Sequence, residues 1–590
     1  MKKMLVIIVI LAMILVSMII YKNIAINKNK SVNVQEVEQI EEYISKIYMW
    51  KEITKESLPT FENINNANEL WVWEVIKKNL ETYETTYEEI QQKGKELFGE
   101  KFERQIPKEG NDSFYYDKES NAVLYSDWSA VYTYYLDVKG YRDQNGNTYD
   151  TEYEVIKTAD GVIYIDFEYM AAVSNISYEY AKEPQRLVLH TTHEEQNEVT
   201  IRKNTVVRYR AGIKSKVLEK VKKGTVCQYV GAVDDDWIEV ITPSGYQGYV
   251  KKNAASDVYT AVPEDTYTEE YQSNLCGYKV NMTWFQVTQR AANAYIDTYL
   301  EDVSGINTIS PTWYSIADGT GELTSLASDT FVSNMHARGL KVWPLVNDFN
   351  NNVDYAAFYS SKTARTKLIN NLMQEARQYG YDGYNIDFEY VKKDFADDYL
   401  QFLRELSIAC QNNGLVLSVD NYKPANHNAH YELAEQAVFV DYIVIMGYDE
   451  HYAGSDAGSV ASLPFVDDGI SRAVSMVPSE QVINAVPFYT RIWTENAGET
   501  KSRAVGMQAA MDAMQENGAT AEWDETTGQY YCTYETSAGT VQIWFEEDRS
   551  IGEKMKLYSK YKLGGVAEWK LGLETSSVWS IISNGLNYAS

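Results

Sequence analysis

The chain has 590 residues and a formal net charge of −30, from 54 Lys and Arg against 84 Asp and Glu. This excess of negative charge repels phosphate backbones and argues against nucleic acid as a partner. A hydrophobic content of 45% predicts a folded protein, and the length predicts several domains. The four cysteines are far apart and form no Cys-x-x-Cys pair, which argues against a zinc cage. We therefore expect no metal and no cofactor.

The N-terminus carries a hydrophobic segment. Lys2 and Lys3 precede residues 4–21, which contain no charged side chain. Roughly 18 residues approach the length that crosses the hydrocarbon core of a membrane as a helix. No small-x-small cleavage site follows, so we favour an uncleaved signal anchor over a cleaved signal peptide. Lysines flank both sides and do not fix the orientation. From the substrate inferred below, we expect residues 1–30 to be a single-pass cell-membrane anchor and the rest to be extracytoplasmic.

Three modules and a linker are predicted to follow the anchor. Residues 31–110 repeat apolar side chains at helical spacing and are expected to be helical. Residues 111–195 contain short alternating runs typical of strands and resemble, near Val162, the module named after the N-terminal domain of copper amine oxidases, without implying copper. Residues 199–252 resemble a bacterial SH3-like domain, which implies either a tether to the cell wall or a spacer without a ligand. Residues 253–275 are the predicted linker.

Residues 276–590 alternate between apolar runs and amphipathic helical patterns. Such alternation indicates a parallel sheet buried on both faces, and about eight candidate strands indicate a (β/α)8 TIM barrel. The predicted fold class is therefore α/β, preceded by the SH3-like β-barrel, a mixed N-terminal region and one transmembrane helix. The expected strands include 307–310, 340–347, 384–388, 415–419, 442–446, 482–486 and 565–569, and the expected helices include 331–338, 363–378 and 395–410.

One predicted strand carries the residues for chemistry, in the sequence Asp382-Gly383-Tyr384-Asn385-Ile386-Asp387-Phe388-Glu389. Side chains alternate along a strand, so Asn385, Asp387 and Glu389 share one face, which in a barrel points inward. Catalysis in such barrels occurs at the carboxyl ends of the strands. Neighbouring buried carboxylates disfavour double ionisation, so one of their pKa values should rise. The result is a protonated carboxylic acid near neutral pH, as glycosidic-bond cleavage requires.

The pattern Asp-Gly-x-x-x-Asp-x-Glu resembles glycoside hydrolase family 18, the chitinase and endo-N-acetylglucosaminidase family. Met446-Gly447-Tyr448-Asp449, Pro487-Phe488-Tyr489-Thr490-Arg491 and Trp569 follow in the order that the family shows. Residues 523–545 resemble the small α+β insertion common in this family. Ser310-Pro311-Thr312-Trp313-Tyr314 and Val419-Asp420-Asn421-Tyr422 are most similar to the subgroup of spore-cortex and cell-wall glucosaminidases.

The resemblance implies a substrate-assisted mechanism with net retention. Glu389 would be the acid and then the base, Asp387 would hold the acetamido N–H of the substrate, and Tyr448 would bind the acetamido oxygen. Trp569 would form the apolar floor beneath the sugar. The remaining expected substrate-binding residues are Asp382, Asn385, Met446, Asp449, Tyr489, Arg491 and Trp313.

Two features depart from the family pattern. Asn385 stands where many members carry an aspartate, which reduces charge sharing with Asp387 and predicts slower or pH-shifted catalysis. The usual Ser-x-Gly-Gly strand is replaced by residues 340–347. The leading prediction is an endo-acting β-N-acetylglucosaminidase on cell-wall peptidoglycan. A chitinase or chitooligosaccharide hydrolase is the first alternative, and a non-catalytic wall- or glycan-binding protein is the second.

Overall fold

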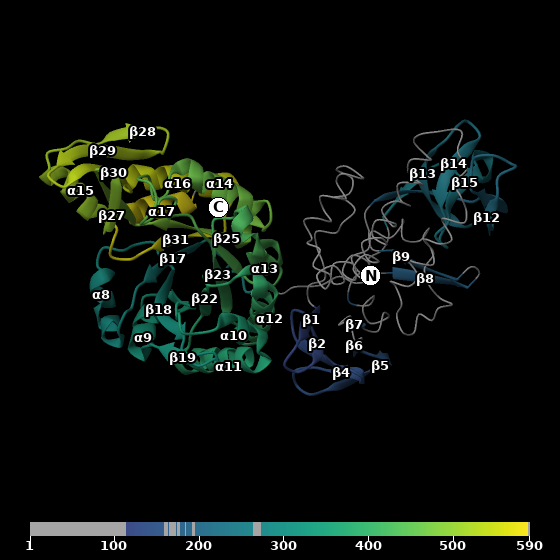
Figure 1. Cartoon of the computed structure of the whole chain (residues 1–590), viewed down its shortest axis with the longest axis horizontal. Helices are drawn as coiled ribbons and strands as arrows, with labels where there is room; N and C mark the ends of the chain where they lie inside the picture. Colours follow the sequence, from purple (N-terminus) through teal and green to yellow (C-terminus); the bar gives the residue numbers. More distant parts are fainter. Residues whose placement is uncertain are drawn as a thin grey trace. The chain divides into compact units, whose positions relative to one another are not determined.

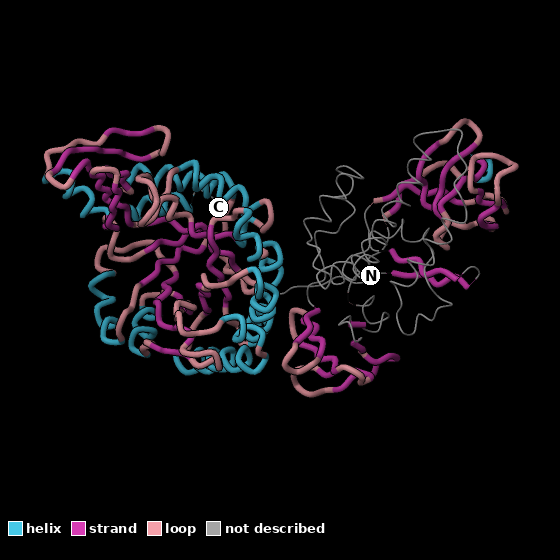
Figure 2. The backbone as a smooth tube through the Cα atoms, viewed as in Figure 1, coloured by secondary structure: helices cyan, strands magenta, loops and turns pink. Residues whose placement is uncertain are grey.

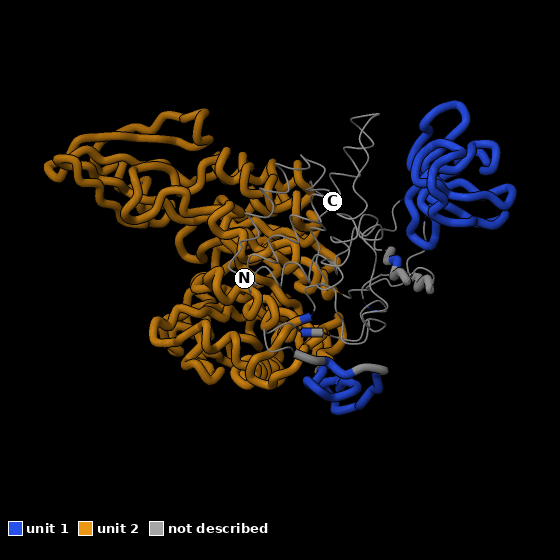
Figure 3. The backbone as a smooth tube through the Cα atoms, turned by 45° about the vertical axis from the view of Figure 1, so that its right-hand side comes forward, with its two compact units in different colours: residues 1–114, 134–269 blue, residues 115–133, 270–590 orange. Residues whose placement is uncertain are grey.

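The computed structural model describes residues 114–157, 163–164, 173, 177–182, 185–190, 195–262 and 273–587. The predicted membrane anchor and helical region lie outside these residues. In the described part, no helix combines the length and the apolar character that a membrane crossing needs. The chain divides into two compact units (Figure 3), and we call residues 115–133 with 270–590 the barrel unit and residues 1–114 with 134–269 the N-terminal unit.

The barrel unit is built around a closed barrel of parallel strands (Figure 1). The strand β17 pairs with both β18 and β31, which closes the sheet. Two short strands, β20 and β21, together form the third strand of the barrel. The chain between them contains Pro344, which has no N–H to donate to a neighbouring strand. The predicted (β/α)8 barrel is confirmed. Its strands are β17 (Val280–Phe285), β18 (Thr308–Ile316), β20 (Lys341–Val342), β21 (Leu345–Asn347), β22 (Gly383–Asp387), β23 (Val416–Tyr422), β24 (Tyr442–Met446), β25 (Val482–Pro487) and β31 (Gly565–Trp569), with β19 (Leu323–Ser325) antiparallel to β18.

Helices surround these strands (Figure 2) and bury their apolar faces against the outer side of the barrel. Side-chain caps start several of them: Ser361 accepts from the backbone N–H of Ala364 at the start of α11, and Gly380 ends that helix in the left-handed conformation. The helices and 3₁₀ turns are η2 (Arg290–Tyr295), α8 (Ile296–Tyr299), α9 (Asp329–Ala337), α10 (Tyr355–Ser360), α11 (Lys362–Tyr379), η3 (Lys393–Phe395), α12 (Ala396–Asn412), η4 (Asn426–Tyr431), α13 (Leu433–Phe439), α14 (Leu463–Val474), η5 (Ser479–Gln481), α16 (Asp548–Tyr561) and α17 (Val578–Asn587).

An antiparallel insertion follows β25, and it is larger than the predicted segment 523–545. The prediction covers only its second half, because the first strand of the insertion begins almost without a break after the barrel strand. The strand order is β27-β26-β30-β29-β28, with its own small core. Its elements are β26 (Tyr489–Asn496), β27 (Glu499–Gly506), α15 (Met507–Glu516), β28 (Glu522–Asp524), β29 (Gln529–Thr536) and β30 (Gly539–Phe545).

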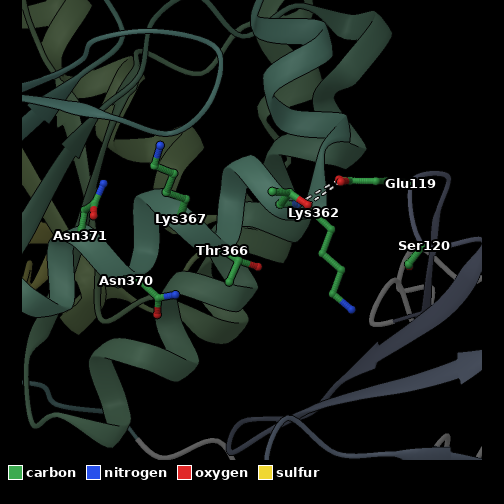
Figure 4. Close-up of a pocket in the computed structure, with 8 residues that line it drawn as sticks. Glu119, Ser120, Lys362, Thr366, Lys367, Asn370 and Asn371 are labelled. Atoms are coloured by element: carbon green, nitrogen blue, oxygen red, sulfur yellow. Dashed lines mark hydrogen bonds between the residues drawn. The ribbon is translucent and has the colours of Figure 1, made fainter.

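Residues 115–133 pack on the helices of the barrel unit although they lie far from it in the sequence. Tyr115 donates a hydrogen bond to Asp398 of α12, and Glu119 accepts from the backbone N–H of Thr363 at 2.9 Å. Figure 4 shows Glu119 at the start of α11, beside an open pocket of about 550 Å³. The residues of the candidate active site described below do not line this pocket. These contacts attach the segment to the barrel.

Strands dominate the described residues of the N-terminal unit. One antiparallel sheet near the start of the described residues has the strand order β1-β2-β3-β4-β5. A second antiparallel sheet, ordered β12-β11-β15-β14-β13-β10-β16, has its own apolar core around Val240 and Val250. It contains the range predicted to be SH3-like and extends through β16 into the predicted linker. The bounds are β1 (Phe114–Asp117), β2 (Ala122–Ser126), β3 (Val131–Tyr135), β4 (Lys139–Arg142), β5 (Thr148–Glu154), β6 (Ile156–Lys157), β7 (Ile163–Tyr164), β8 (Ser177–Lys182), β9 (Gln185–His190), β10 (Gln196–Thr200), β11 (Thr205–Arg208), β12 (Val217–Val221), β13 (Val226–Ala232), β14 (Trp237–Ile241), β15 (Gln247–Lys251), η1 (Lys252–Ala254) and β16 (Tyr259–Ala261).

Candidate active site

Polar side chains gather at the carboxyl end of β22. Asn385 and Asp387 are 0% and 6% exposed, and Glu389 is partly buried just beyond the strand. The strand can lie this close to β23 because residue 383 is glycine. A Cβ there would lie 2.5 Å from the carbonyl oxygen of Val416. The glycine therefore sets the position of the strand that carries the two acidic side chains.

The side-chain amide of Asn385 is fixed by its neighbours. Its Oδ1 accepts from the indole Nε1 of Trp284 at 2.8 Å, and its Nδ2 donates to Ser418 Oγ at 3.1 Å and to Asp420 Oδ1 at 2.7 Å. The Nδ2 contacts reach β23, and the Oδ1 also accepts from Ser310 Oγ of β18 at 3.4 Å in addition to Trp284 of β17. Asn385 therefore joins four barrel strands.

The carboxyl group of Asp387 has an unusual environment. Its Oδ1 is buried and has no hydrogen-bond partner among the described residues. Burial raises the pKa of this carboxyl group well above its ordinary value, and the negative charges of Asp420, Glu389 and Asp348 raise it further. A carboxyl group in this position favours its protonated form until a partner stabilises the anion.

Glu389 is held from two sides. Tyr422 of β23 donates a hydrogen bond to its Oε2. The carboxylate of Asp348, which follows β21, accepts from the backbone N–H groups of Glu389 and Tyr390, both at 2.8 Å. Burial raises the pKa of Glu389, the Tyr422 hydrogen bond lowers it, and the charge of Asp449 raises it. Burial also raises the pKa of Asp348 to about 7. Glu389 thus has the raised pKa that a general acid needs.

Aromatic and polar side chains from the later strands line the same end of the barrel. Tyr489 donates to Asp449 Oδ1 at 2.5 Å, and its ring lies 6.2 Å from that of Tyr448, centroid to centroid. Burial raises the pKa of Tyr448, and the charges of Asp387 and Glu389 are among the effects that raise it further. Trp569 meets Trp284 edge to face, with centroids 5.6 Å apart.

Met446 and Arg491 lie near these side chains along the chain. Met446 is the last residue of β24, two residues before Tyr448. Arg491, in β26, donates to Ser502 Oγ at 3.1 Å, and its buried Nε has no partner among the described residues. Met446 thus ends a barrel strand, whereas Arg491 lies in the first strand of the insertion, two residues after Tyr489.

The structure does not bring Asp382 and Trp313 to this site. Asp382 precedes β22, at the opposite end of the strand, where its carboxylate lies 2.8 Å from both His336 Nε2 and Lys341 Nζ. Trp313 is 1% exposed and packs against Phe331 of α9, because it occupies the helix-facing side of β18. The sequence pattern assigned both residues to substrate binding, and their positions contradict that assignment.

Sequence reasoning missed the parts that Asp348, Asp420, Tyr422 and Trp284 play. Three of the four stand at the carboxyl ends of barrel strands: Asp348 directly follows the predicted strand 340–347, and Asp420 and Tyr422 extend the predicted strand 415–419. A search for polar residues after each predicted strand would have found these three. Trp284 lies inside an apolar run, and the sequence carries no signal for its hydrogen bond to Asn385.

The geometry defines the class of the protein. A partly buried glutamic acid with a raised pKa lies two residues from a buried aspartate, in a barrel end lined by aromatic rings. Glycosidases use carboxyl groups for proton transfer, and aromatic rings beside them can stack against the sugar.

The comparisons with known proteins identify the family. The model of glycosyl hydrolases family 18 matches residues 280–574, half of the chain, and the chain belongs to this family of glycosidases. The cortical fragment-lytic enzyme of Bacillus subtilis is 29% identical over 243 residues, which cover 39% of this chain and 55% of that protein. The putative sporulation-specific glycosylase YdhD of Bacillus subtilis is 29% identical over 289 residues, covering 48% and 64%. The crystal structure of a chitinase from Chromobacterium violaceum aligns with a TM-score of 0.47 and 24% identity, over 52% of this chain and 99% of that one. The chain thus spans 55% to 64% of the length of the two curated relatives.

Removing the hydroxyl group of Tyr422 should shift the pH dependence of hydrolysis. Its hydrogen bond lowers the pKa of Glu389, so Tyr422→Phe should raise that pKa. The acid form of Glu389 then persists to higher pH, and the alkaline limb of kcat/KM should move upward. The measurement is a pH–rate profile on a soluble chitooligosaccharide, with Tyr452→Phe, at an exposed tyrosine, as the control. An unchanged or downward-shifted limb would contradict this view of the hydrogen bond.

Proposed function

We propose that the protein is a retaining, endo-acting β-N-acetylglucosaminidase that cleaves cell-wall peptidoglycan with the help of the substrate's own acetamido group. The observation that carries this proposal is the pair Asp387 and Glu389, side by side at one barrel end with raised pKa values. Substrate-assisted cleavage needs one group that donates a proton and a second group that accepts a hydrogen bond from the acetamido nitrogen. This pair offers both.

In the proposed first step, Glu389 protonates the leaving glycosidic oxygen while the acetamido carbonyl oxygen attacks C1. The C1–O glycosidic bond breaks and a C1–O bond to the acetamido group forms, giving an oxazolinium ion. Asp387 accepts a hydrogen bond from the acetamido N–H, and its negative charge stabilises that ion. Tyr448, whose pKa the charges of Asp387 and Glu389 raise, would bind the acetamido oxygen.

In the second step, Glu389 has lost its proton and acts as the base for a water molecule. The water attacks C1 from the side that the leaving group occupied, so the configuration at C1 is retained. The oxazolinium ring opens and the acetamido group is restored. Trp569 offers an apolar surface against which the sugar ring can stack, and stacking holds C1 near Glu389.

The choice of peptidoglycan rests on the relatives and on the rest of the chain. The name of the Bacillus subtilis relative says that it lyses cortical fragments, which supports a wall polymer. We further propose that the sheet from β10 to β16 is an SH3-like module that holds the enzyme at the wall. Residues 1–30 would then anchor the protein in the cell membrane with its barrel outside. A chitinase is the second candidate, favoured by relatives such as the class V chitinase of Arabidopsis thaliana, 24% identical over 257 residues.

The acetamido requirement can be tested with matched oligosaccharides. The full chain should cleave N-acetylated chitooligosaccharides or peptidoglycan fragments and should lose cleavage when the sugar at the scissile bond is de-N-acetylated, because the internal nucleophile is then missing. Proton NMR during the first minutes should show the β anomer before mutarotation. Initial formation of the α anomer, or equal cleavage of the de-N-acetylated oligomer, would refute the substrate-assisted mechanism. The ratio of rates on the two polymers decides between peptidoglycan and chitin.

A further inference from the structure

Asp420 lies beside Asp387 on the neighbouring strand. The strands β22 and β23 run parallel, with Asn385 opposite Ser418 and Ile386 opposite Val419. Continuing this register places Asp387 opposite Asp420. Because side chains alternate along each strand and Asn385 reaches Asp420 from the inward face, both carboxyl groups occupy that face.

Both carboxyl groups are buried without a countercharge. Asp420 is 3% exposed, and its described hydrogen-bond donor is the neutral amide of Asn385 at 2.7 Å. Burial raises the pKa of each carboxyl group, and the charge of Asp420 is the largest electrostatic contribution to that of Asp387. Two adjacent carboxylates in such a place cannot both ionise at moderate cost. The pair therefore favours keeping at least one proton.

The surroundings reinforce this conclusion. In the part of the chain that the structure describes, the ionisable groups found to act on the pair are acids or phenols, and none of these groups carries a positive charge. They come from every side of the site: Asp348 after β21, Glu389 after β22, Tyr399 on α12, Tyr422 on β23, Tyr431 in η4 and Tyr448 after β24.

We propose that Asp420 is a positioning residue for Asp387 and that the two side chains share one proton during catalysis. This inference rests on the proposed function. When Asp387 turns its charge toward the acetamido nitrogen, the proton passes from Asp387 to Asp420, and it returns when the oxazolinium ion is hydrolysed. No proton enters or leaves the pair. Asn385 cannot take this part, because its amide has no exchangeable acidic proton and is already held by its neighbours.

The kinetic test compares Asp420→Ala with Ser418→Ala in the full chain. Both substitutions remove an acceptor for the Nδ2 of Asn385, but only the first removes a carboxyl group. Asp420→Ala should lower kcat by about 10-fold to 10²-fold with little change in KM. It should also move the acidic limb of kcat to higher pH, because the anion of Asp387 loses its hydrogen bond from protonated Asp420. Ser418→Ala should leave that limb in place.

A rescue variant distinguishes proton sharing from a structural role. Adding Asn385→Asp to Asp420→Ala returns a carboxyl group to the pair from the same strand as Asp387. The double variant should regain much of kcat and the parental acidic limb. Identical pH profiles for Asp420→Ala and Ser418→Ala, or no rescue, would overturn the proposal.

A stability measurement tests the same pair independently of any substrate. Folding raises the pKa of such a carboxyl group above its pKa in the unfolded chain. The group's contribution to stability is complete at pH values below the pKa in the unfolded chain, and it is lost as the pH rises through the pKa in the folded protein. Combining Asp387→Asn with Asp420→Asn removes the pair and the proton that it holds. The melting temperature of this variant relative to the parent should therefore increase steadily between pH 5 and pH 8. A difference that does not change with pH would overturn the shared proton. If the parent protein hydrolyses no glycan, the proposed function fails. The stability measurement still shows whether the two carboxyl groups hold a proton in the folded protein.

Discussion

Hydrolysis by the Glu389→Gln variant should be slower than hydrolysis by the parent protein by roughly 10²–10⁴-fold, the usual contribution of a general acid and base. Glutamine keeps the shape of the side chain and can still meet the hydroxyl group of Tyr422. It has no proton to give to the glycosidic oxygen. KM and the melting temperature should change little, because binding and folding do not need that proton. Steady-state kinetics on peptidoglycan and on chitooligosaccharides provide the measurement.

Glu553→Gln is the matched control for this substitution. Glu553 lies on α16, paired with Lys556 at 2.7 Å and away from the site. The control should hydrolyse as fast as the parent protein. Parental rates from the Glu389→Gln variant would show that another group supplies the proton, and the assignment of the acid would then be wrong.

The largest loss of stability is expected from Lys554→Met. The ammonium group of Lys554 and the carboxylate of Glu546 are both fully buried and lie 2.9 Å apart. Removing the lysine leaves the glutamate charge buried without its cation, at a cost of about 3–5 kcal/mol in the free energy of unfolding. Denaturant titration of the full chain, followed by tryptophan fluorescence, measures this loss.

Two further variants show whether the unpaired charge of Glu546 causes the loss of stability. Lys556→Met breaks the exposed pair with Glu553 on the same helix and should leave the free energy of unfolding nearly unchanged. Adding Glu546→Gln to Lys554→Met removes the unpaired charge and should recover part of the stability. A loss in the double variant as large as in Lys554→Met would assign the effect to packing instead of charge.

The barrel could be predicted because its strands are buried on both faces and form continuous apolar runs. The predicted bounds of β24 and β31 coincide with the observed ones. Prediction was weaker where the functional end of a strand becomes polar. The strand β23 continues to Tyr422, past Asp420 and Asn421. Because these two residues are polar, the apolar pattern ended the predicted strand too early.

Residue patterns alone predicted the part of the candidate site that belongs to one strand, and the family resemblance added Tyr448, Tyr489 and Trp569 from later strands. Alternation along β22 brought Asn385, Asp387 and Glu389 together from the sequence alone. The contact of Asn385 with Asp420 depends on the register between two strands, which local sequence does not encode. Trp313 was misplaced because a single strand does not reveal which of its faces points inward, and β18 shifts its register between Thr312 and Tyr314.

The central claim is best tested by mass spectrometry of peptidoglycan digested with the full chain and then reduced with borohydride. The account predicts new reduced N-acetylglucosamine ends, formed by the parent protein and absent after digestion with Glu389→Gln. New reduced ends on N-acetylmuramic acid would contradict the proposed bond. The absence of new ends from peptidoglycan, with cleavage of chitooligosaccharides, would contradict the proposed substrate.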